Sequence, residues 1–109
     1  MAKYFGTDGI RGKYGEKLDE QLAYKTGLAI GEIYGEGTFV VGRDTRISGE
    51  ELESALVRGI AEMGGEALLL GILPTPAVAM LAIRHNAKCG IMISASHNPP
   101  EYNGIKVFD

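Results

Sequence analysis

The sequence has a single cysteine, no tryptophan and only four prolines among its 109 residues. Cys89 alone can form neither an internal disulfide nor a zinc cluster, and secreted domains of this size often carry disulfides, so we expect a reducing compartment. The N-terminus lacks the apolar stretch of a signal peptide, and no segment approaches the roughly 18 apolar residues of a membrane-spanning helix. The sequence therefore predicts a soluble cytoplasmic protein in which Cys89 is a small buried side chain with no chemical role.

The chain also lacks an excess of either charge. It has 11 Lys and Arg against 14 Asp and Glu, a formal net charge of −3. This balance gives no general attraction for nucleic acids or anionic membranes, so we expect neither partner, and an anion-binding site would have to be local. Hydrophobic residues (45%) and charged residues (23%) are close to the globular average. We therefore expect one domain over residues 1–109 with a buried core.

Glycine, in contrast, is abundant, and several of the 16 glycines fall where helices are expected to end. Asp19 is a candidate cap for a helix ending near Gly35, and Ser48 and Glu51 have capping-box spacing before a helix ending at Gly64. The apolar stripes that we expect these two helices to bury are Leu22, Thr26, Ala29, Ile30 and Ile33 in the first, and Leu52, Ala55, Leu56, Ile60 and Met63 in the second.

Thr75 and Pro76 have the residue types of an N-cap and a first helical position. They predict a third helix that runs through Ala77, Met80, Leu81 and Ile83 and ends near residues 85–86. Short apolar runs predict buried strands at residues 38–41, 67–70 and 90–94. A fourth run, residues 105–108, alternates apolar and polar residues, so we expect it at a sheet edge.

Strands that alternate with helices predict the α/β class: a three-layer α/β/α sandwich with a mixed, mainly parallel four-stranded sheet and right-handed crossovers. Ligands of such sheets bind outside the carboxyl ends of the strands, where loops converge. Two polar segments, residues 42–46 and 94–100, follow expected strands, and the glycine-rich residues 6–12 form a third candidate. The sequence predicts a binding site on this rim.

Ser96 and His97 are the first candidates for chemistry, but side chains of adjacent residues in an extended loop point in different directions. A hydrolase dyad within this pair is therefore disfavoured. The chain has no Gly-x-Ser-x-Gly elbow, and the second histidine, His85, is expected at a helix end.

Phosphate chemistry is better supported by the residue types. Ser94 and Ser96 offer hydroxyls, Asn98 an amide, and Arg11 and Lys106 positive charge, while flanking glycines let backbone N–H groups approach an anion. The nucleotide-binding Gly-x-x-x-x-Gly-Lys and strand-linked Gly-x-Gly-x-x-Gly patterns are absent. The plainer alternative, ordinary polar loop residues, stays open at this point.

Five segments resemble the first domain of the α-D-phosphohexomutases, in the right order and over nearly the whole chain. The opening segment most resembles the phosphoglucosamine mutases of that family, with the phosphomannomutase/phosphoglucomutase enzymes next. The segments are residues 6–12 (GTDGIRG), 42–46 (GRDTR), 74–76 (PTP), 94–99 (SASHNP) and 102–106 (YNGIK).

The resemblance implies that Ser96 is the family's phosphoserine. Such a serine gives its phosphoryl group to a hexose monophosphate and takes one back from the bisphosphate intermediate, so that phosphate moves between the 6-hydroxyl and C1. Phosphoryl transfer is catalysed chiefly by positioning and charge stabilisation. The implied cofactor is therefore Mg²⁺ on the Ser96 phosphate, held also by aspartates of the family's second domain, whose Asp-Gly-Asp-x-Asp loop is not in this sequence.

The resemblance also implies roles for residues near that phosphate. His97 would hold or polarise the phosphoserine, and Asn98 and Thr7 would shape the phosphate loops. Lys106 would be the general acid or base, because neighbouring cations lower a lysine pKa, whereas the guanidinium of Arg11 stays protonated and stabilises charge.

Arg43 and Asp44 are expected either to support the serine loop as a pair or to form a purely structural salt bridge, and Arg46 is expected to face a neighbouring domain. Family members have four domains, so we expect this chain to fold alone, to lack turnover, and to self-associate through an exposed interdomain surface. The resemblance of the opening segment, residues 6–12, implies glucosamine phosphate as the substrate. The alternatives are a phosphomannomutase/phosphoglucomutase domain, or a silent α/β folding or sugar-phosphate-binding module.

Overall fold

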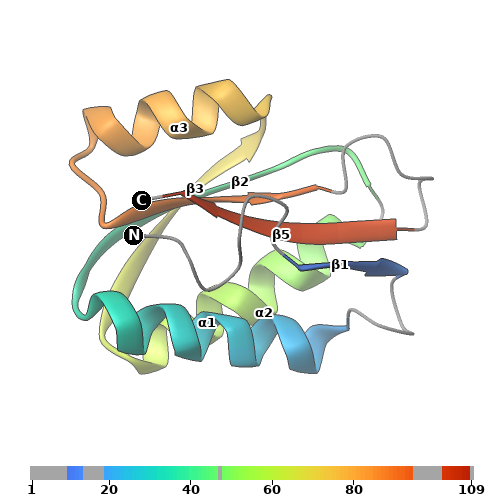
Figure 1. Cartoon of the computed structure of the whole chain (residues 1–109), viewed down its shortest axis with the longest axis horizontal. Coiled ribbons are helices and arrows are strands. Elements are labelled where there is room, and N and C mark those ends of the chain that lie inside the picture. Colours follow the sequence, from blue (N-terminus) through green and yellow to red (C-terminus); the bar gives the residue numbers. More distant parts are fainter. Residues whose placement is uncertain (1–9, 14–18, 47, 95–101, 109) are drawn as a thin grey trace.

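The structure is a computed structural model that describes residues 10–13, 19–46, 48–94 and 102–108. Helices α1 and α2 cover one face of a sheet and α3 covers the other (Figure 1), which confirms the expected three-layer α/β class. The elements found in these residues are, in chain order, β1 (Ile10–Lys13), α1 (Glu20–Tyr34), β2 (Gly37–Arg43), α2 (Gly49–Glu62), β3 (Gly65–Ile72), α3 (Thr75–Arg84), β4 (Cys89–Ile93) and β5 (Tyr102–Phe108).

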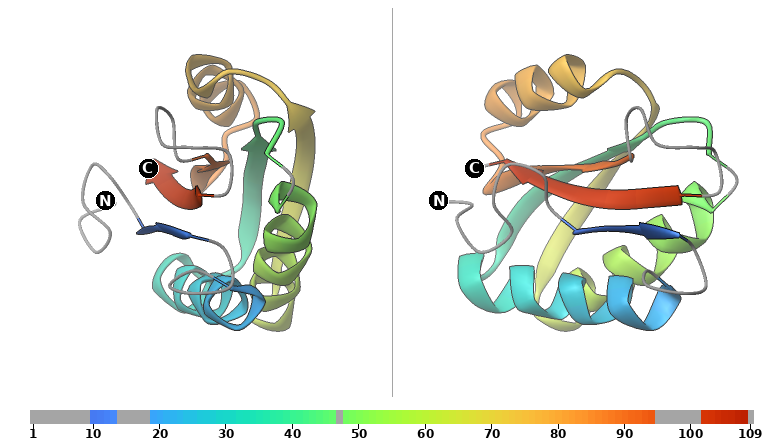
Figure 2. Two further views of the ribbon diagram at one scale, coloured as in Figure 1. Left: turned by 90° about the vertical axis from the view of Figure 1, so that its right-hand side faces the viewer. Right: turned by 45° about the vertical axis from the view of Figure 1, so that its right-hand side comes forward.

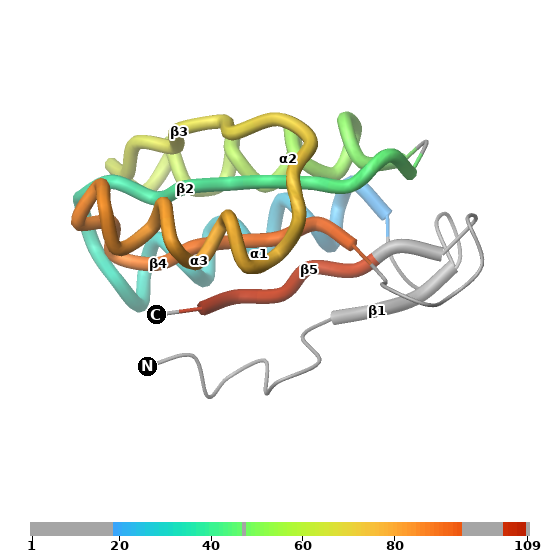
Figure 3. The backbone as a smooth tube through the Cα atoms, turned by 90° about the horizontal axis from the view of Figure 1, so that it is seen from above, coloured from blue at the N-terminus to red at the C-terminus, as the bar shows by residue number. Residues whose placement is uncertain are grey.

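The strands lie in the order β1-β5-β4-β2-β3. Figure 3 shows β5, β4, β2 and β3 side by side. Strands β4, β2 and β3 are parallel, whereas β5 runs antiparallel to β4. The four expected strands thus form the mixed, mainly parallel set that the sequence predicted. Strand β1, which the apolar pattern did not predict, pairs antiparallel with the other side of β5.

The edges of the sheet are a correction to the sequence analysis. Residues 105–108 were expected at an edge, but β1 covers the outer side of β5, so β5 lies inside the sheet. The run 67–70 was expected to be buried, yet β3 is an edge strand and Leu69 is 58% exposed. Edge strands have a neighbour on one side only, so an apolar run in such a strand leaves apolar surface uncovered.

The ends of α1 follow the sequence prediction. The carboxylate of Asp19 accepts a hydrogen bond from the backbone N–H of Leu22 at 2.9 Å, and Gly35 ends the helix with φ of +75°. Such a bond satisfies one of the N–H groups that a helix start leaves unpaired. At the end of α2, Gly64 likewise has a positive φ, of +89°.

Two caps differ from the prediction. Ser48 occupies the N-cap position of α2 but makes no side-chain capping bond, because its backbone is itself in the helical region, with φ of −76° and ψ of −1°. The capping box is therefore wrong, since an N-cap side chain reaches the helix from an extended backbone. In α3, Pro74 is the N-cap and Thr75 the first helical residue, one position earlier than expected.

The buried face of α1 is rotated from the predicted stripe. Ile33 is exposed, and the buried residues are Ala23, Thr26, Gly27, Ile30 and Gly31. The reason is the close approach of α1 to α2: a Cβ atom on Gly27 would collide with the Leu56 carbonyl oxygen, and one on Gly59 with the Tyr24 carbonyl oxygen. Glycine, which carries no apolar side chain, therefore marks the contact face.

Helices α2 and α3 differ in how clearly their sequences indicate a buried face. The stripe of α2 is buried as expected, except that Met63 at the C-cap is exposed. In α3 only Val78 is fully buried, and the apolar residues Met80 and Ile83 are exposed, Ile83 by 83%. Because α3 is apolar almost all round, periodicity cannot select its inner face. No helix in the described residues is long and apolar enough to cross a membrane.

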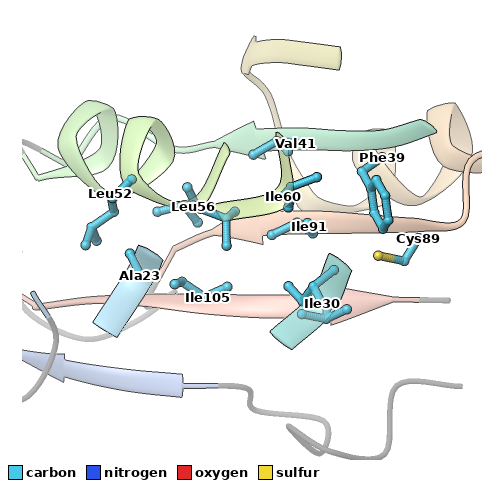
Figure 4. Close-up of a cluster of buried hydrophobic side chains, with 13 residues drawn as sticks. Ala23, Ile30, Phe39, Val41, Leu52, Leu56, Ile60, Cys89, Ile91 and Ile105 are labelled. Atoms are coloured by element: carbon cyan, nitrogen blue, oxygen red, sulfur yellow. The ribbon is translucent and has the colours of Figure 1, made fainter. Parts of the chain in front are cut away.

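Cys89 lies in the main core, between the sheet and helices α1 and α2, beside Phe39 (Figure 4). It is a free thiol with 1% exposure, as the sequence predicted, and burial raises its pKa to about 12. Because the thiolate is the reactive form, we expect Cys89 in the native chain to resist iodoacetamide near pH 8 and to react fully in denaturant. Mass spectrometry of the labelled chain measures this, and fast labelling without unfolding would contradict the burial.

Candidate functional site

Strands β2, β3 and β4 end at one side of the molecule, where β5 begins (Figure 2). A hollow of about 540 Å³ lies at these strand ends, on the rim where the sequence predicted a site. The loop between β3 and α3 also lines the hollow, although it was not among the three segments expected at the site. Its position after an expected parallel strand is the sequence signal that could have identified it. The lining residues are Asp44, Thr45, Ile72, Leu73, Pro74, Thr75, Met92 and Ser94.

Asp44 connects the loop after β2 to the end of β4. Its backbone N–H donates to the Ile93 carbonyl at 3.2 Å. Its carboxylate accepts three hydrogen bonds: Oδ1 from the backbone N–H of Arg46 at 3.1 Å, and Oδ2 from Arg46 Nε at 3.0 Å and from the Ser94 hydroxyl at 2.7 Å. Asp44 therefore links two of the segments in which the sequence predicted the site, residues 42–46 and 94–100.

Ser94 is joined on its other side to β5, because its backbone N–H donates to the Gly104 carbonyl at 2.9 Å. Across β5, the register places Arg11 of β1 opposite Gly104. Lys106 lies two residues further along β5, opposite Met92 of β4, and is half-buried. The fold thus places Arg11 and Lys106 on the neighbouring strands β1 and β5, and Ser94 directly after β4, which pairs with the other side of β5.

The other predicted site residues, Thr7, Ser96, His97 and Asn98, lie outside the described residues, and their roles stay predictions. The two ends of the segment that carries three of them are described, since Ser94 precedes it and β5 follows it. His85 is the exposed C-cap residue of α3, as expected, at the opposite end of that helix from the hollow.

Arg43 and Asp44 do not form the pair that the sequence analysis considered. Consecutive strand residues point to opposite faces, so Arg43 turns toward α2. There its guanidinium lies 3.5 Å from Glu53 and 4.0 Å from Glu50. The expectation for Arg46 is also wrong: its side chain is only 9% exposed and is turned toward Asp44, not outward.

Glu53 is a buried carboxylate behind the site, with its side chain 10% exposed. Burial raises its pKa above the ordinary value of 4.5, and the positive charge of Arg43, 3.5 Å away, only partly opposes this effect. Burial in a protein disfavours the charged form of a carboxyl group. The ion pair behind the site therefore carries a cost in stability when Glu53 is ionised.

This cost predicts a pH dependence. A carboxyl group whose pKa is raised by folding contributes stability that is present below its unfolded pKa and is lost as the pH rises through the folded pKa. We therefore expect the stability of the Glu53→Gln variant relative to the unsubstituted chain to rise between pH 4 and pH 7. Urea unfolding at both pH values measures the difference. A shift in the other direction would show that Arg43 outweighs the burial of Glu53.

A magnesium site is not formed by the described residues alone. They contain no group of three or more His, Cys, Asp or Glu side chains placed to hold a metal ion. Asp44, the carboxylate of the hollow, already accepts hydrogen bonds at both oxygens from Arg46 and Ser94. Mg²⁺ prefers six oxygen ligands in octahedral geometry, which this set does not offer.

Comparison with known proteins gives a consistent result. The family model for phosphoglucomutase/phosphomannomutase, alpha/beta/alpha domain I, matches residues 2–109. Curated relatives include the phosphoglucosamine mutase of Thermotoga maritima, 63% identical over 105 residues, and that of Clostridium tetani, 58% identical over an alignment of 113 positions. These matches cover 96% and 100% of this chain but only 24% and 25% of the two relatives.

Solved structures agree with this assignment. A protein of Thermus thermophilus described as a phosphomannomutase has a TM-score of 0.88 and 36% identity, over 96% of this chain and 25% of that one. A phosphoglucomutase/phosphomannomutase family protein of Burkholderia thailandensis has a TM-score of 0.83 and 35% identity, over 95% and 25%. This chain, which spans about a quarter of the length of these relatives, belongs to the phosphoglucomutase/phosphomannomutase family and corresponds to its domain I.

Proposed function

We propose that this chain contributes the reacting serine to the active site of a phosphohexomutase. The proposed substrate is glucosamine 6-phosphate or glucosamine 1-phosphate. Support for the substrate comes from the relatives named phosphoglucosamine mutase, at up to 63% identity. The observation that carries the proposal is the backbone register beside the segment with Ser96: Ser94, which follows β4, binds Gly104 of β5, Arg11 of β1 lies opposite Gly104, and Lys106 lies two residues further along β5.

In the proposed reaction, phosphorylated Ser96 gives its phosphoryl group to a free hydroxyl of the hexose phosphate. The bond between phosphorus and the serine oxygen breaks and a bond to the sugar oxygen forms. The proton of the sugar hydroxyl moves to a base, and the serine oxygen that is released takes up a proton. After the bisphosphate reorients, its other phosphoryl group returns to Ser96, the serine hydroxyl gives up its proton, and the sugar oxygen that is released takes one up. Each half uses the same groups in opposite roles, as microscopic reversibility requires.

Lys106 is the proposed proton carrier, since it is a half-buried lysine on the strand that follows the serine segment. Arg11, opposite Gly104, would stabilise charge on the transferred group, because a guanidinium stays protonated. His97 would orient the phosphoserine, and Asn98 and Thr7 would shape the loops around it. Nearly all catalysis of phosphoryl transfer comes from such positioning and charge stabilisation.

Family membership also supports Mg²⁺ as the cofactor, with the phosphate on Ser96 as one ligand and its remaining ligands outside this chain. When bound, the ion would neutralise charge on the phosphoryl oxygens. Residues 1–109 alone should therefore bind sugar phosphates weakly at most and show no turnover. Mutase activity of the isolated chain would overturn this expectation.

Self-association remains a further proposal. Four exposed apolar side chains on β3 and α3 support it, because contact with a second copy of the chain would remove their surface from water. Sedimentation that shows a clean monomer at high concentration would count against it. The residues concerned are Leu69, Ile72, Met80 and Ile83.

The test of function is a hybrid in which residues 1–109 replace the matching segment of the Thermotoga maritima phosphoglucosamine mutase. At 63% identity, most contacts with the rest of that enzyme should be retained. We expect the hybrid to convert glucosamine 6-phosphate to the 1-phosphate. Parallel assays with mannose 6-phosphate and glucose 6-phosphate test the alternative substrates. A folded hybrid that is inactive on all three would contradict the proposal.

A further inference from the structure

Ser94 and Gly104 stand at the two ends of the segment that contains Ser96. Ser94 follows β4 directly and lies two residues before Ser96, while Gly104 lies in β5. The 2.9 Å hydrogen bond from the Ser94 amide to the Gly104 carbonyl joins these ends. The position of Ser94 therefore sets the point from which the segment leaves the sheet.

A second, side-chain contact holds Ser94. Its hydroxyl donates to Asp44 Oδ2 at 2.7 Å across 50 positions of sequence. Hydrogen bonds to a carboxylate are shorter and about twice as strong as those between neutral groups. Ser94 is thus fixed by its backbone to β5 and by its side chain to the loop after β2.

Asp44 is itself held in place. Its backbone N–H binds the Ile93 carbonyl, and its carboxylate accepts both the backbone N–H and the Nε–H of Arg46. The bond from the residue two positions on is the Asx turn that aspartate forms in loops. The Arg46 side chain is 9% exposed, so this cation stays against the carboxylate.

From this arrangement we propose that Asp44 is a positioning residue for phosphoryl transfer: through the Ser94 hydroxyl it fixes the strand end from which the Ser96 segment departs. This inference rests on the proposed function. Asp44 is poorly suited to contact a sugar phosphate, because a carboxylate offers no hydrogen-bond donor and both of its oxygens already accept from Arg46 and Ser94. Its effect on the reaction is therefore indirect.

Kinetics of the hybrid test the role in catalysis. We expect Asp44→Ala and Ser94→Ala each to lower kcat about 10- to 100-fold, because small misplacements of reacting groups cost rates of this order. KM should change less than about threefold. The kcat of the double variant should lie within about threefold of that of the slower single variant, since the two substitutions remove the same hydrogen bond. Ser94→Thr, which keeps the hydroxyl, should restore most of kcat.

The inference is overturned by a raised KM with unchanged kcat in Asp44→Ala, which would indicate substrate contact. It is equally overturned by normal kcat in Ser94→Ala beside a slow Asp44→Ala. An inactive unsubstituted hybrid would contradict the proposed function and would not test Asp44. The role of Asp44 is then tested by hydrogen exchange, which needs no activity.

Amide hydrogen exchange in the 109-residue chain tests the contact directly. Asp44→Ala should speed exchange of the Ser94 amide at least about tenfold while the Ile91 amide, in the core, stays protected, because only local opening changes. The matched control is Asp19→Ala, which removes the N-cap carboxylate of α1. This carboxylate also accepts a backbone N–H, and its loss should leave exchange of the Ser94 amide unchanged. Ser94→Thr should exchange like the unsubstituted chain. Unchanged exchange of the Ser94 amide in Asp44→Ala, with the Ile91 amide protected, would overturn the inference.

Discussion

Replacing Gly59 with alanine should lower the free energy of unfolding by about 2–4 kcal/mol, although alanine is the better helix former. A Cβ atom at this position would lie 2.7 Å from the backbone nitrogen of Leu28 and would also collide with the Tyr24 carbonyl oxygen. Both atoms belong to the backbone of α1 and cannot rotate away. The two helices must therefore separate, and the core beneath them loses contacts. Urea unfolding followed by circular dichroism measures the change.

Gly49→Ala is the matched control, in the first residue of the same helix. There a Cβ atom would meet the Arg43 side chain at 3.4 Å, an ordinary contact, and φ is not positive. We expect this variant to be unchanged or up to about 1 kcal/mol more stable, because alanine restricts the unfolded chain. Equal effects of the two substitutions would contradict close packing of α1 on α2 as the cause.

Ser96→Ala in the hybrid should abolish turnover, with a loss of roughly 10³-fold or more, because the covalent acceptor of the phosphoryl group is gone. Ser94→Ala serves as the matched control: it removes a hydroxyl two positions away and should keep about 1–10% of kcat. Measured rates with glucosamine 6-phosphate separate the two variants. Comparable rates for Ser96→Ala and the unsubstituted hybrid would show that another group carries the phosphoryl.

The elements themselves were predictable because their signals are local. Asp19 caps α1 and Gly35 ends it where the sequence indicated, and β4 is buried along its length. A cap or a run of apolar residues acts within a few positions, so it can be recognised without knowledge of the fold. The buried strands β2 and β4 and the two ends of α1 therefore followed directly from the sequence, whereas the N-caps of α2 and α3 and the burial of β3 did not.

The corrections concern what lies next to each element. Leu69 has an apolar side chain on an edge strand, while 105–108 alternates yet lies inside the sheet. Gly27 and Gly59 mark the contact between α1 and α2, although a hydropathy pattern gives glycine no weight. Neighbours of this kind are set by tertiary packing, which no single segment encodes.

The candidate site, like the fold, was predictable from the sequence only in part. Polar residues at strand ends predicted its place, and the resemblance of five segments predicted its chemistry. The partners were not predictable: Arg43 binds Glu53 across the core-facing side, and Asp44 binds Ser94, 50 positions away. Alternation of strand residues does predict that Arg43 and Asp44 face opposite ways, and this signal could have excluded their pairing.

The most direct test of the account is the location of the phosphoryl group. The hybrid, incubated with glucosamine 1,6-bisphosphate and digested, is analysed by mass spectrometry. We predict one added phosphoryl group, on the peptide that contains Ser96, and none in the Ser96→Ala variant. A folded, active hybrid that carries the phosphoryl group on another residue, or that retains it in Ser96→Ala, would contradict the central claim that this domain supplies the reacting serine.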